Sequence, residues 1–199
     1  MSYSQFTFKT VKKQFGLTEI KQPLFPKIEE IQISDWLKNT LAITTTLSLN
    51  SEKARSEGIV APFLFELKAR NSDKITLFSG EVLDIDSQQG LNGECDFILS
   101  QSPHSTTIDA PILCVVEAKQ HIIEKNLGQC VAQMIGAHEF NQIENTPIEI
   151  LFGAVTTGEI WQFLKLEKKI IYTDINRYYL ENTNKIMGVL QKIVNFYEE

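Results

Sequence analysis

The chain has 199 residues, of which 43% are hydrophobic and 22% are charged, as is ordinary for one folded domain with a sizeable core. No apolar run approaches the about 20 residues that cross a bilayer, and residues 1–5 lack a signal peptide's apolar centre, so we expect a cytoplasmic protein without membrane contact. The net charge of −6 argues against a broad surface for nucleic acid, and three cysteines without a Cys-x-x-Cys pair argue against a disulfide framework or a zinc site.

Residues 1–50 are expected to form an N-terminal extension that packs on the core, and residues 51–199 to form the main unit of a single globular domain. The pattern predicts a short strand at 6–8, a short helix at 10–15 ended by Gly16, and a helix that begins after Ser34 as its N-cap. No residue in this region carries recognisable chemistry. Packing, or contact between two copies of the chain, is its expected role.

An amphipathic helix is predicted to follow Ser51, with apolar residues at a spacing of three to four up to Leu67. Pro62 should kink or restart this helix, because proline removes one helical hydrogen bond. Glu57 lies in its first turns and is either a solvated charge or part of a site. Residues 75–86 then read as a long strand or bent ribbon.

Two further strands carry the acidic residues that matter most. Residues 94–100 follow the turn signal Asn92-Gly93, and residues 112–116 are five consecutive apolar positions leading into Glu117-Ala118-Lys119. If the two strands pair antiparallel with Leu99 opposite Leu113, Asp96 falls opposite position 116 to within one or two residues. Opposed Cβ atoms in such a pair are only about 5 Å apart, so Asp96 and Glu117 should share one end of the sheet.

Two carboxylates placed this close repel each other unless a cation lies between them. Hard divalent cations such as Mg²⁺, for which Mn²⁺ can substitute, take oxygen ligands of this kind. Lys119 projects from the same face of the strand as Glu117, where an ammonium could orient a water molecule or stabilise charge on a phosphate oxygen. The pattern therefore predicts a site that cleaves phosphodiester bonds.

The rest of the chain predicts a helix over 124–140, strands over 148–156 and 160–166, an edge strand near 168–172, and a closing helix over 182–197. Gln129 and Gln133 share one face of the first of these helices. Gln129 is either an exposed amide or a site residue, and His121 and Lys125 rank below it as candidates. Trp161 and Phe163 are expected to pack in the core rather than stack on bases.

Asp96 followed by Glu117-Ala118-Lys119 resembles the motif of the PD-(D/E)xK, or restriction-endonuclease-like, nuclease superfamily. Cys95 occupies the position of the motif's proline, which is often missing in that superfamily. The stretch from Ser56 to Leu64 also resembles the helix that carries the first glutamate in nuclease domains of type I restriction enzymes. The resemblance implies an α/β fold: an αβββαβ core with a mixed central sheet flanked by helices, here with an N-terminal extension and a C-terminal hairpin and helix.

The resemblance also implies roles for particular residues. Asp96 and Glu117 would bind Mg²⁺ with the carbonyl of Ala118, Glu57 would complete the metal's shell, Lys119 would orient or activate the attacking water, and Gln129 would support the site. The expected function is hydrolysis of nucleic acid, with DNA favoured over RNA, by a chain that could form a homodimer. The rival interpretation is a nuclease-fold protein that no longer cuts and serves as a binding or regulatory subunit.

A third interpretation is a structural α/β domain with a fortuitous salt bridge between Glu117 and Lys119. It predicts that Asp96 and Glu57 lie far from that pair, so the positions of these two acids decide how much of the motif is real.

Overall fold

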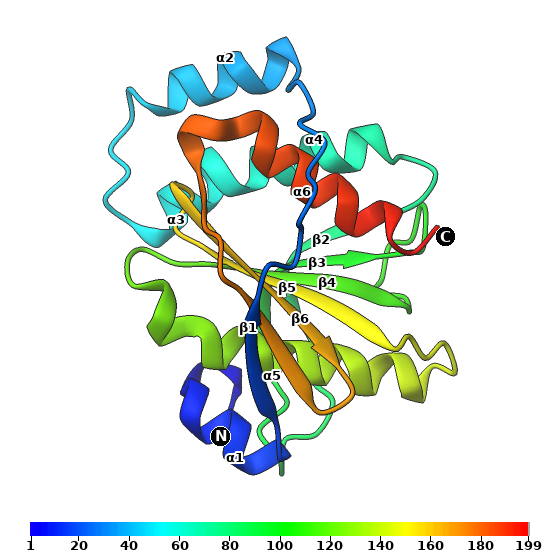
Figure 1. Ribbon diagram of the computed structural model, residues 1–199. Helices are drawn as coiled ribbons and strands as arrows, with labels where there is room; N and C mark the ends of the chain where they lie inside the picture. Colours follow the sequence, from blue (N-terminus) through cyan, green and yellow to red (C-terminus); the bar gives the residue numbers. More distant parts are fainter. Residues whose placement is uncertain (199) are drawn as a thin grey trace.

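A computed structural model describes residues 1–198 and has an α/β architecture, with one open, mixed sheet of eight strands covered by helices on both faces (Figure 1). The strand order is β1-β7-β6-β5-β4-β3-β2, and β8 pairs with β6. The strands span Thr18–Gln22 (β1), Thr76–Val82 (β2), Glu94–Ser100 (β3), Ile112–Ala118 (β4), Ile150–Thr156 (β5), Ile160–Glu167 (β6), Ile170–Asp174 (β7) and Tyr178–Tyr179 (β8).

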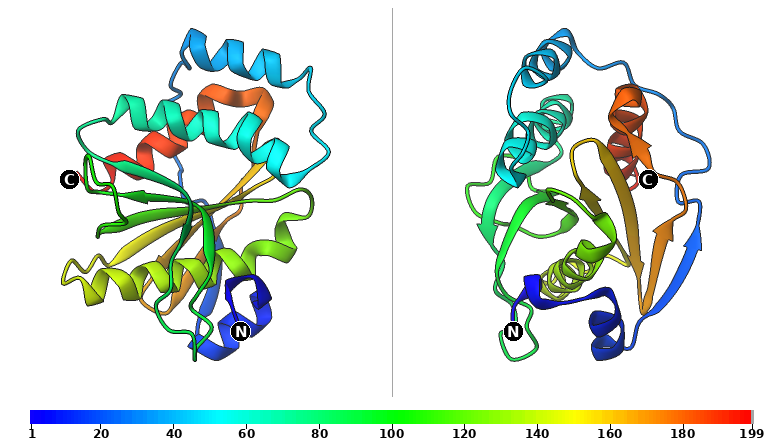
Figure 2. Two further views of the ribbon diagram at one scale, coloured as in Figure 1. Left: turned by 180° about the vertical axis from the view of Figure 1, so that it is seen from behind. Right: turned by 90° about the vertical axis from the view of Figure 1, so that its left-hand side faces the viewer.

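The helices divide between the two faces of the sheet, as Figure 2 shows. One face carries α5 and α1 with the 3₁₀ turn η1, and the other carries α2, α4 and α6. Their bounds are Tyr3–Gln5 (η1), Phe8–Phe15 (α1), Asp35–Thr44 (α2), Glu52–Arg55 (α3), Ala61–Arg70 (α4), Ile123–Ile143 (α5), Leu180–Asn182 (η3) and Thr183–Asn195 (α6). A π-helical segment, Ser56–Val60 (η2), joins α3 to α4.

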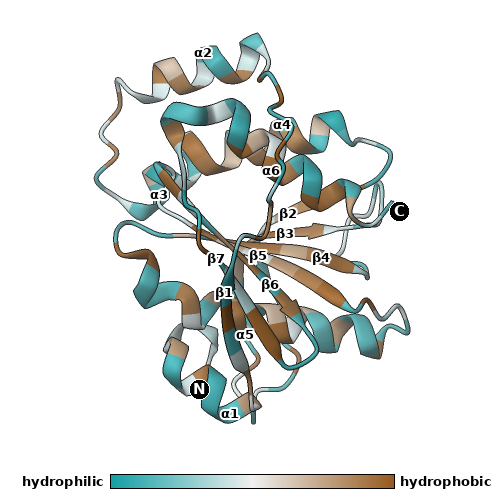
Figure 3. Cartoon of the chain, viewed as in Figure 1, coloured by the Kyte–Doolittle hydropathy of each residue, from teal (hydrophilic) through white to brown (hydrophobic). Residues whose placement is uncertain are grey.

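Each face of the sheet buries its own apolar cluster, and the central strands are correspondingly hydrophobic in Figure 3. All seven residues of β4 are buried, because this strand has a neighbour on each edge and helices on each face. A carboxylate at the end of such a strand is therefore drawn partly into the core. Among the described residues, no helix is both long and apolar enough to cross a membrane.

The central part of the sheet is a meander followed by a crossover. β2, β3 and β4 pair antiparallel in chain order, α5 then crosses one face, and β5 returns parallel to β4. The predicted antiparallel pairing of β3 with β4 is confirmed with a slip of one residue, because Leu99 lies opposite Cys114 rather than Leu113. This register brings Asp96 level with Glu117, one position nearer than assumed.

Two local predictions from the sequence are wrong, and one strand was not predicted. Residues 6–8 form no strand, since Thr7 is the N-cap of α1, accepting a hydrogen bond from the Thr10 N–H. Residues 18–22 form a strand that was not predicted, β1, whose mixed polar sequence suits its exposed position. Because β1 pairs parallel with β7, the strand after Lys169 is covered on that side and is not the edge of the sheet.

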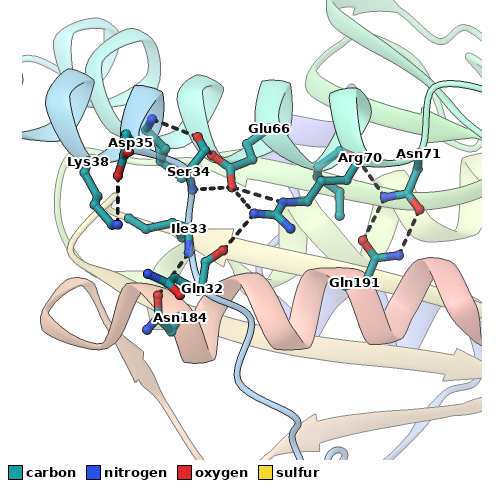
Figure 4. Close-up of polar contacts among 12 residues, drawn as sticks. Gln32, Ile33, Ser34, Asp35, Lys38, Glu66, Arg70, Asn71, Asn184 and Gln191 are labelled. Atoms are coloured by element: carbon teal, nitrogen blue, oxygen red, sulfur yellow. Dashed lines mark hydrogen bonds and ion pairs between the residues drawn. The ribbon is translucent and has the colours of Figure 1, made fainter.

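The predicted N-cap at Ser34 is confirmed, and it also anchors α2 to α4 (Figure 4). The buried carboxylate of Glu66 accepts hydrogen bonds from the Ser34 N–H at 2.9 Å and from the Ser34 hydroxyl at 2.5 Å. Arg70 completes the group with an ion pair to Glu66 at 2.6 Å and a hydrogen bond to the carbonyl of Gln32. The helix layer that covers this face is thus held by a charged network as well as by apolar contact.

Candidate active site

Asp96 and the Glu117-Ala118-Lys119 segment meet at one end of β3 and β4. Asp96 Oδ2 accepts a hydrogen bond of 2.7 Å from the main-chain N–H of Ala118. The third interpretation, a fortuitous Glu117–Lys119 salt bridge, predicted a distant Asp96 and is wrong on that point.

Glu117 is the most enclosed acid of the group, with 1% of its side chain exposed. Its Oε1 lies 2.6 Å from Lys119 Nζ and also accepts a hydrogen bond from Gln129. Its Oε2 accepts a hydrogen bond of 2.6 Å from Gln133. Gln129 and Gln133 come from successive turns of α5. The carboxylate of Glu117 therefore lies between β4, which carries it, and α5, which donates hydrogen bonds to it.

Burial and the neighbouring acid perturb both carboxyls. Loss of solvent, followed by repulsion from Asp96, raises the pKa of Glu117 to about 8. Loss of solvent likewise raises the pKa of Asp96, although Lys119 and the Ala118 N–H oppose that shift. At pH values where isolated carboxyls are ionised, the pair of acids therefore tends to keep a proton, unless a bound cation replaces that proton.

Lys119 is the cation that already faces these acids, and 14% of its side chain is exposed. Burial alone would lower the pKa of Lys119, but Glu117, Asp96 and Glu52 outweigh it and raise that pKa. The amine is therefore an ammonium at neutral pH. It can donate hydrogen bonds and stabilise negative charge, but it is a poor proton acceptor.

The helical acid beside this group is Glu52 and not Glu57. Glu52 Oε1 lies 3.4 Å from Lys119 Nζ, whereas Glu57 is 69% exposed and its carboxylate lies 3.7 Å from Lys53. Residues five apart do not share one face of an α-helix, so Glu52 and Glu57 point in different directions. The structure therefore does not bring Glu57 together with the other predicted site residues.

A cavity of about 240 Å³ opens over the acids, and we call it the acidic cavity. Its lining comes from the N-terminal segment, the turn before β3, the ends of β3 and β4, and α5: Ser2, Tyr3, Ser4, Asn92, Gly93, Glu94, Asp96, Glu117, Lys119 and Gln129. The N-terminal wall was not predicted. It is fixed by Tyr3, which is 1% exposed and whose N–H donates to the carbonyl of Asn92 at 3.0 Å.

The residues around the acidic cavity fit a hard divalent cation. Two converging carboxylates repel each other, and a bound cation relieves that repulsion. Asn92, which also lines the cavity, has a buried side-chain oxygen without a hydrogen-bond partner among residues 1–198. Within the same residues, no group of three or more His, Cys, Asp or Glu side chains is arranged to hold a metal. Mg²⁺ is compatible with this set, because it commonly uses one or two carboxylates and keeps several waters.

Arg55, Trp161 and Phe163 lie outside the site. Arg55 pairs with Glu159 at 3.1 Å and donates to the carbonyl of Thr157. Trp161 and Phe163 are fully buried and stack on each other, so they pack in the core as expected.

Sequence reasoning missed Glu52 and the contribution of Gln133. The spacing of Gln133 from Gln129 was the available signal for the latter. The sequence carried no signal for Glu52, because the π-helical segment after it changes which residues of the helix share a face, and the residue pattern does not predict that change.

The chain was also compared with known proteins. It matches no protein-family model and no curated protein. Fold and site define the class of this protein only as an α/β protein with a buried glutamate, a half-buried aspartate and a lysine at one end of a mixed sheet.

Proposed function

We propose that this protein is a Mg²⁺-dependent nuclease that hydrolyses phosphodiester bonds of DNA. The single observation that carries the proposal is the convergence of Asp96 and Glu117 beside the Lys119 ammonium, from three positions that the sequence separates by up to 23 residues. The element order α4-β2-β3-β4-α5-β5 supports a restriction-endonuclease-like core, since it repeats the αβββαβ order of that superfamily.

In this proposal Asp96 and Glu117 hold the metal, with the carbonyl of Ala118 as a further ligand. A bound Mg²⁺ supplies Lewis acidity and lowers the pKa of a coordinated water. Lys119 donates to the attacking water or to the phosphate oxygen on which charge builds up. Glu52 takes the place that the motif suggested for Glu57, because it faces Lys119 at 3.4 Å.

The two glutamines of α5 act on Glu117 rather than on substrate. Gln129 and Gln133 donate to different oxygens of that carboxylate and so fix its orientation. An acid whose rotamer is held in this way presents its oxygens to a cation without reorganisation.

The test is cleavage of linear and circular DNA by the purified chain with Mg²⁺, Mn²⁺ or excess EDTA. We expect cleavage with either metal, none with EDTA, and a loss on the order of 10²-fold or more for Lys119→Gln and Glu117→Gln. Lys53→Gln is the matched control, because Lys53 is 82% exposed and, among residues 1–198, pairs only with the exposed Glu57. Metal-independent cleavage, or full activity in Lys119→Gln, would overturn the proposal.

A second candidate function is a nuclease-fold protein that binds nucleic acid or another protein without cutting. It is favoured by the occupation of both Glu117 oxygens by donors from Lys119, Gln129 and Gln133, and by the net charge of −6. Calorimetric titration with Mg²⁺ distinguishes the two functions. A catalytic site binds the ion in a manner that Asp96→Asn abolishes, whereas a non-cutting descendant needs no such site.

A further inference from the structure

Lys119 stands between two cavities. One is the acidic cavity, and the other is a separate hollow of about 270 Å³, which we call the second cavity. The second cavity is lined by Glu52, Lys119, Gln120, His121, Ile122, Lys125 and Asn126. Lys119 is the one residue that lines both, so a ligand bound in the second cavity lies directly beside the candidate active site.

The balance of charged side chains differs between the two cavities when Lys119, which lines both, is counted in each. Glu94, Asp96 and Glu117 outnumber Lys119 in the acidic cavity, whereas Lys119 and Lys125 outnumber Glu52 in the second. In a chain with a net charge of −6, a hollow with an excess of lysine is a local exception. It is suited to an anion in the same way that the acidic cavity is suited to a cation.

Several polar groups of the second cavity are already engaged by the protein. Gln120 donates to the carbonyl of Asn50, Asn126 donates to the carbonyl of Ile122, and Glu52 faces Lys119. These contacts hold the side chains of Gln120, Asn126 and Glu52 in place. Over residues 1–198, the Lys125 ammonium has neither an ion pair nor a hydrogen bond, and both it and His121 are exposed. Lys125 and His121 are therefore the groups available to a ligand.

We propose that the second cavity is a phosphate-binding subsite for the nucleic-acid backbone. It takes the phosphodiester next to the one that is attacked, with Lys125 as its main cationic contact and His121 beside it. This inference rests on the proposed function, because it assigns the neighbouring phosphate of the same substrate strand. The two hollows are adjacent because they share Lys119, so one strand can contact both, and a chain this acidic must gain its backbone affinity from few such contacts.

The experiment measures binding of a fluorescent 12-nucleotide single-stranded DNA by anisotropy, in EDTA and at several salt concentrations. We expect Lys125→Gln to weaken binding about fivefold, the upper end of what one exposed ion pair contributes. We also expect the slope of log K against log salt to decrease by about 0.7, the value for one lost phosphate contact on a single strand. A merely structural role of Lys125 would not change this slope.

Lys21→Gln is the matched control, since Lys21 is 70% exposed and lies on β1 at the far edge of the sheet. Equal affinity and slope in wild type and Lys125→Gln would overturn the subsite. If the wild type still cuts DNA with Mg²⁺ in that case, the proposed function stands alone. Binding that depends on Lys125 without cleavage would instead support the subsite and refute hydrolysis, and no binding by the wild type at low salt would refute the subsite.

Discussion

Asp96 accepts a hydrogen bond of 2.7 Å from the main-chain N–H of Ala118, so the first acid of the site is fixed to the segment that carries the second acid and the lysine. This bond replaces the ladder hydrogen bond that a continued pairing of β3 with β4 would supply. As a result, the position of Asp96 relative to Glu117 is set by the backbone of β4 and does not depend on a flexible side chain alone.

The bond between Asp96 and Ala118 predicts different outcomes for two substitutions. Asp96→Asn keeps an oxygen that can accept from the Ala118 N–H but loses the charge, so we expect a loss of cleavage by about 10²-fold or more with little change in stability. Asp96→Ala removes the acceptor and leaves a buried N–H unpaired, which should cost about 1–3 kcal/mol of the free energy of unfolding. Urea unfolding and a cleavage assay measure the two effects.

Asp73→Asn serves as the control, because Asp73 is exposed in the turn after α4. Equal stability of the Asn and Ala variants would show that the hydrogen bond to Ala118 does not hold the segment.

The acid pair also predicts how stability depends on pH in the absence of metal. The pKa of Glu117 is raised from 4.5 to about 8 by burial and by Asp96, so between these values the folded protein keeps a proton that the unfolded chain has lost. The free energy of unfolding should therefore fall as pH rises through this window, by up to about 1.4 kcal/mol per pH unit from this group.

Glu117→Gln removes the titrating group and is the comparison for this measurement. Chemical unfolding in EDTA at pH values from 5 to 9 should give a steeper decline for the wild type than for the variant. Parallel curves would mean that Glu117 is ionised throughout and that the acids do not perturb each other.

The sequence predicted the centre of this protein better than its periphery. The apolar run before Glu117 identified a buried strand, and its pairing with the strand of Asp96 needed only the loop length and the alternation of faces. β1 was not predicted because an edge strand needs few apolar residues and pairs with a strand far away in the sequence, here β7.

Glu52 was not predicted as a site residue because a π-helical segment follows its helix, and the local pattern of apolar residues does not reveal such a segment. The wall formed by residues 2–4 arises from tertiary packing on α5, which no local signal encodes.

The packing of the N-terminal segment on α5 predicts the effect of one methyl group. A Cβ added to Gly128 would lie 2.3 Å from the main-chain carbon of Thr7 and 2.5 Å from Phe6 O and Phe8 N. Alanine favours a helix over glycine by about 1 kcal/mol, but these neighbours are backbone atoms that cannot move aside singly. We therefore expect Gly128→Ala to destabilise the protein by about 1–3 kcal/mol and to loosen residues 2–8.

Urea unfolding and hydrogen exchange of the N-terminal segment check this expectation. Glu139→Ala, at an exposed position of the same helix, is the control and should change stability little. Because residues 2–4 form a wall of the acidic cavity, Gly128→Ala should also change the cleavage rate while leaving Asp96 and Glu117 in place. A variant more stable than the wild type would show that the segment does not pack this closely.

The charged network of Figure 4 gives a prediction on the opposite face of the sheet. Burial would raise the pKa of Glu66, but hydrogen bonds from Ser34 and the ion pair with Arg70 outweigh it and lower that pKa. Glu66→Gln loses the charge, so we expect a destabilisation of about 2 kcal/mol at pH 7. The stabilisation by Glu66 is complete above its ordinary pKa of 4.5 and is lost as pH falls through the lowered value.

The difference between the unfolding free energies of the wild type and Glu66→Gln should accordingly be full at pH 7 and shrink as pH falls below 4.5. Glu57→Gln is the matched control, because the exposed Glu57 forms an ion pair only with Lys53 among the described residues. The substitution should change stability by no more than about 0.5 kcal/mol at either pH. The same control tests the site, since Glu57→Gln should cut DNA at the wild-type rate if Glu52 is the helical acid that serves Lys119. A Glu66→Gln variant as stable as Glu57→Gln at pH 7 would mean that apolar contact alone holds α2 on α4.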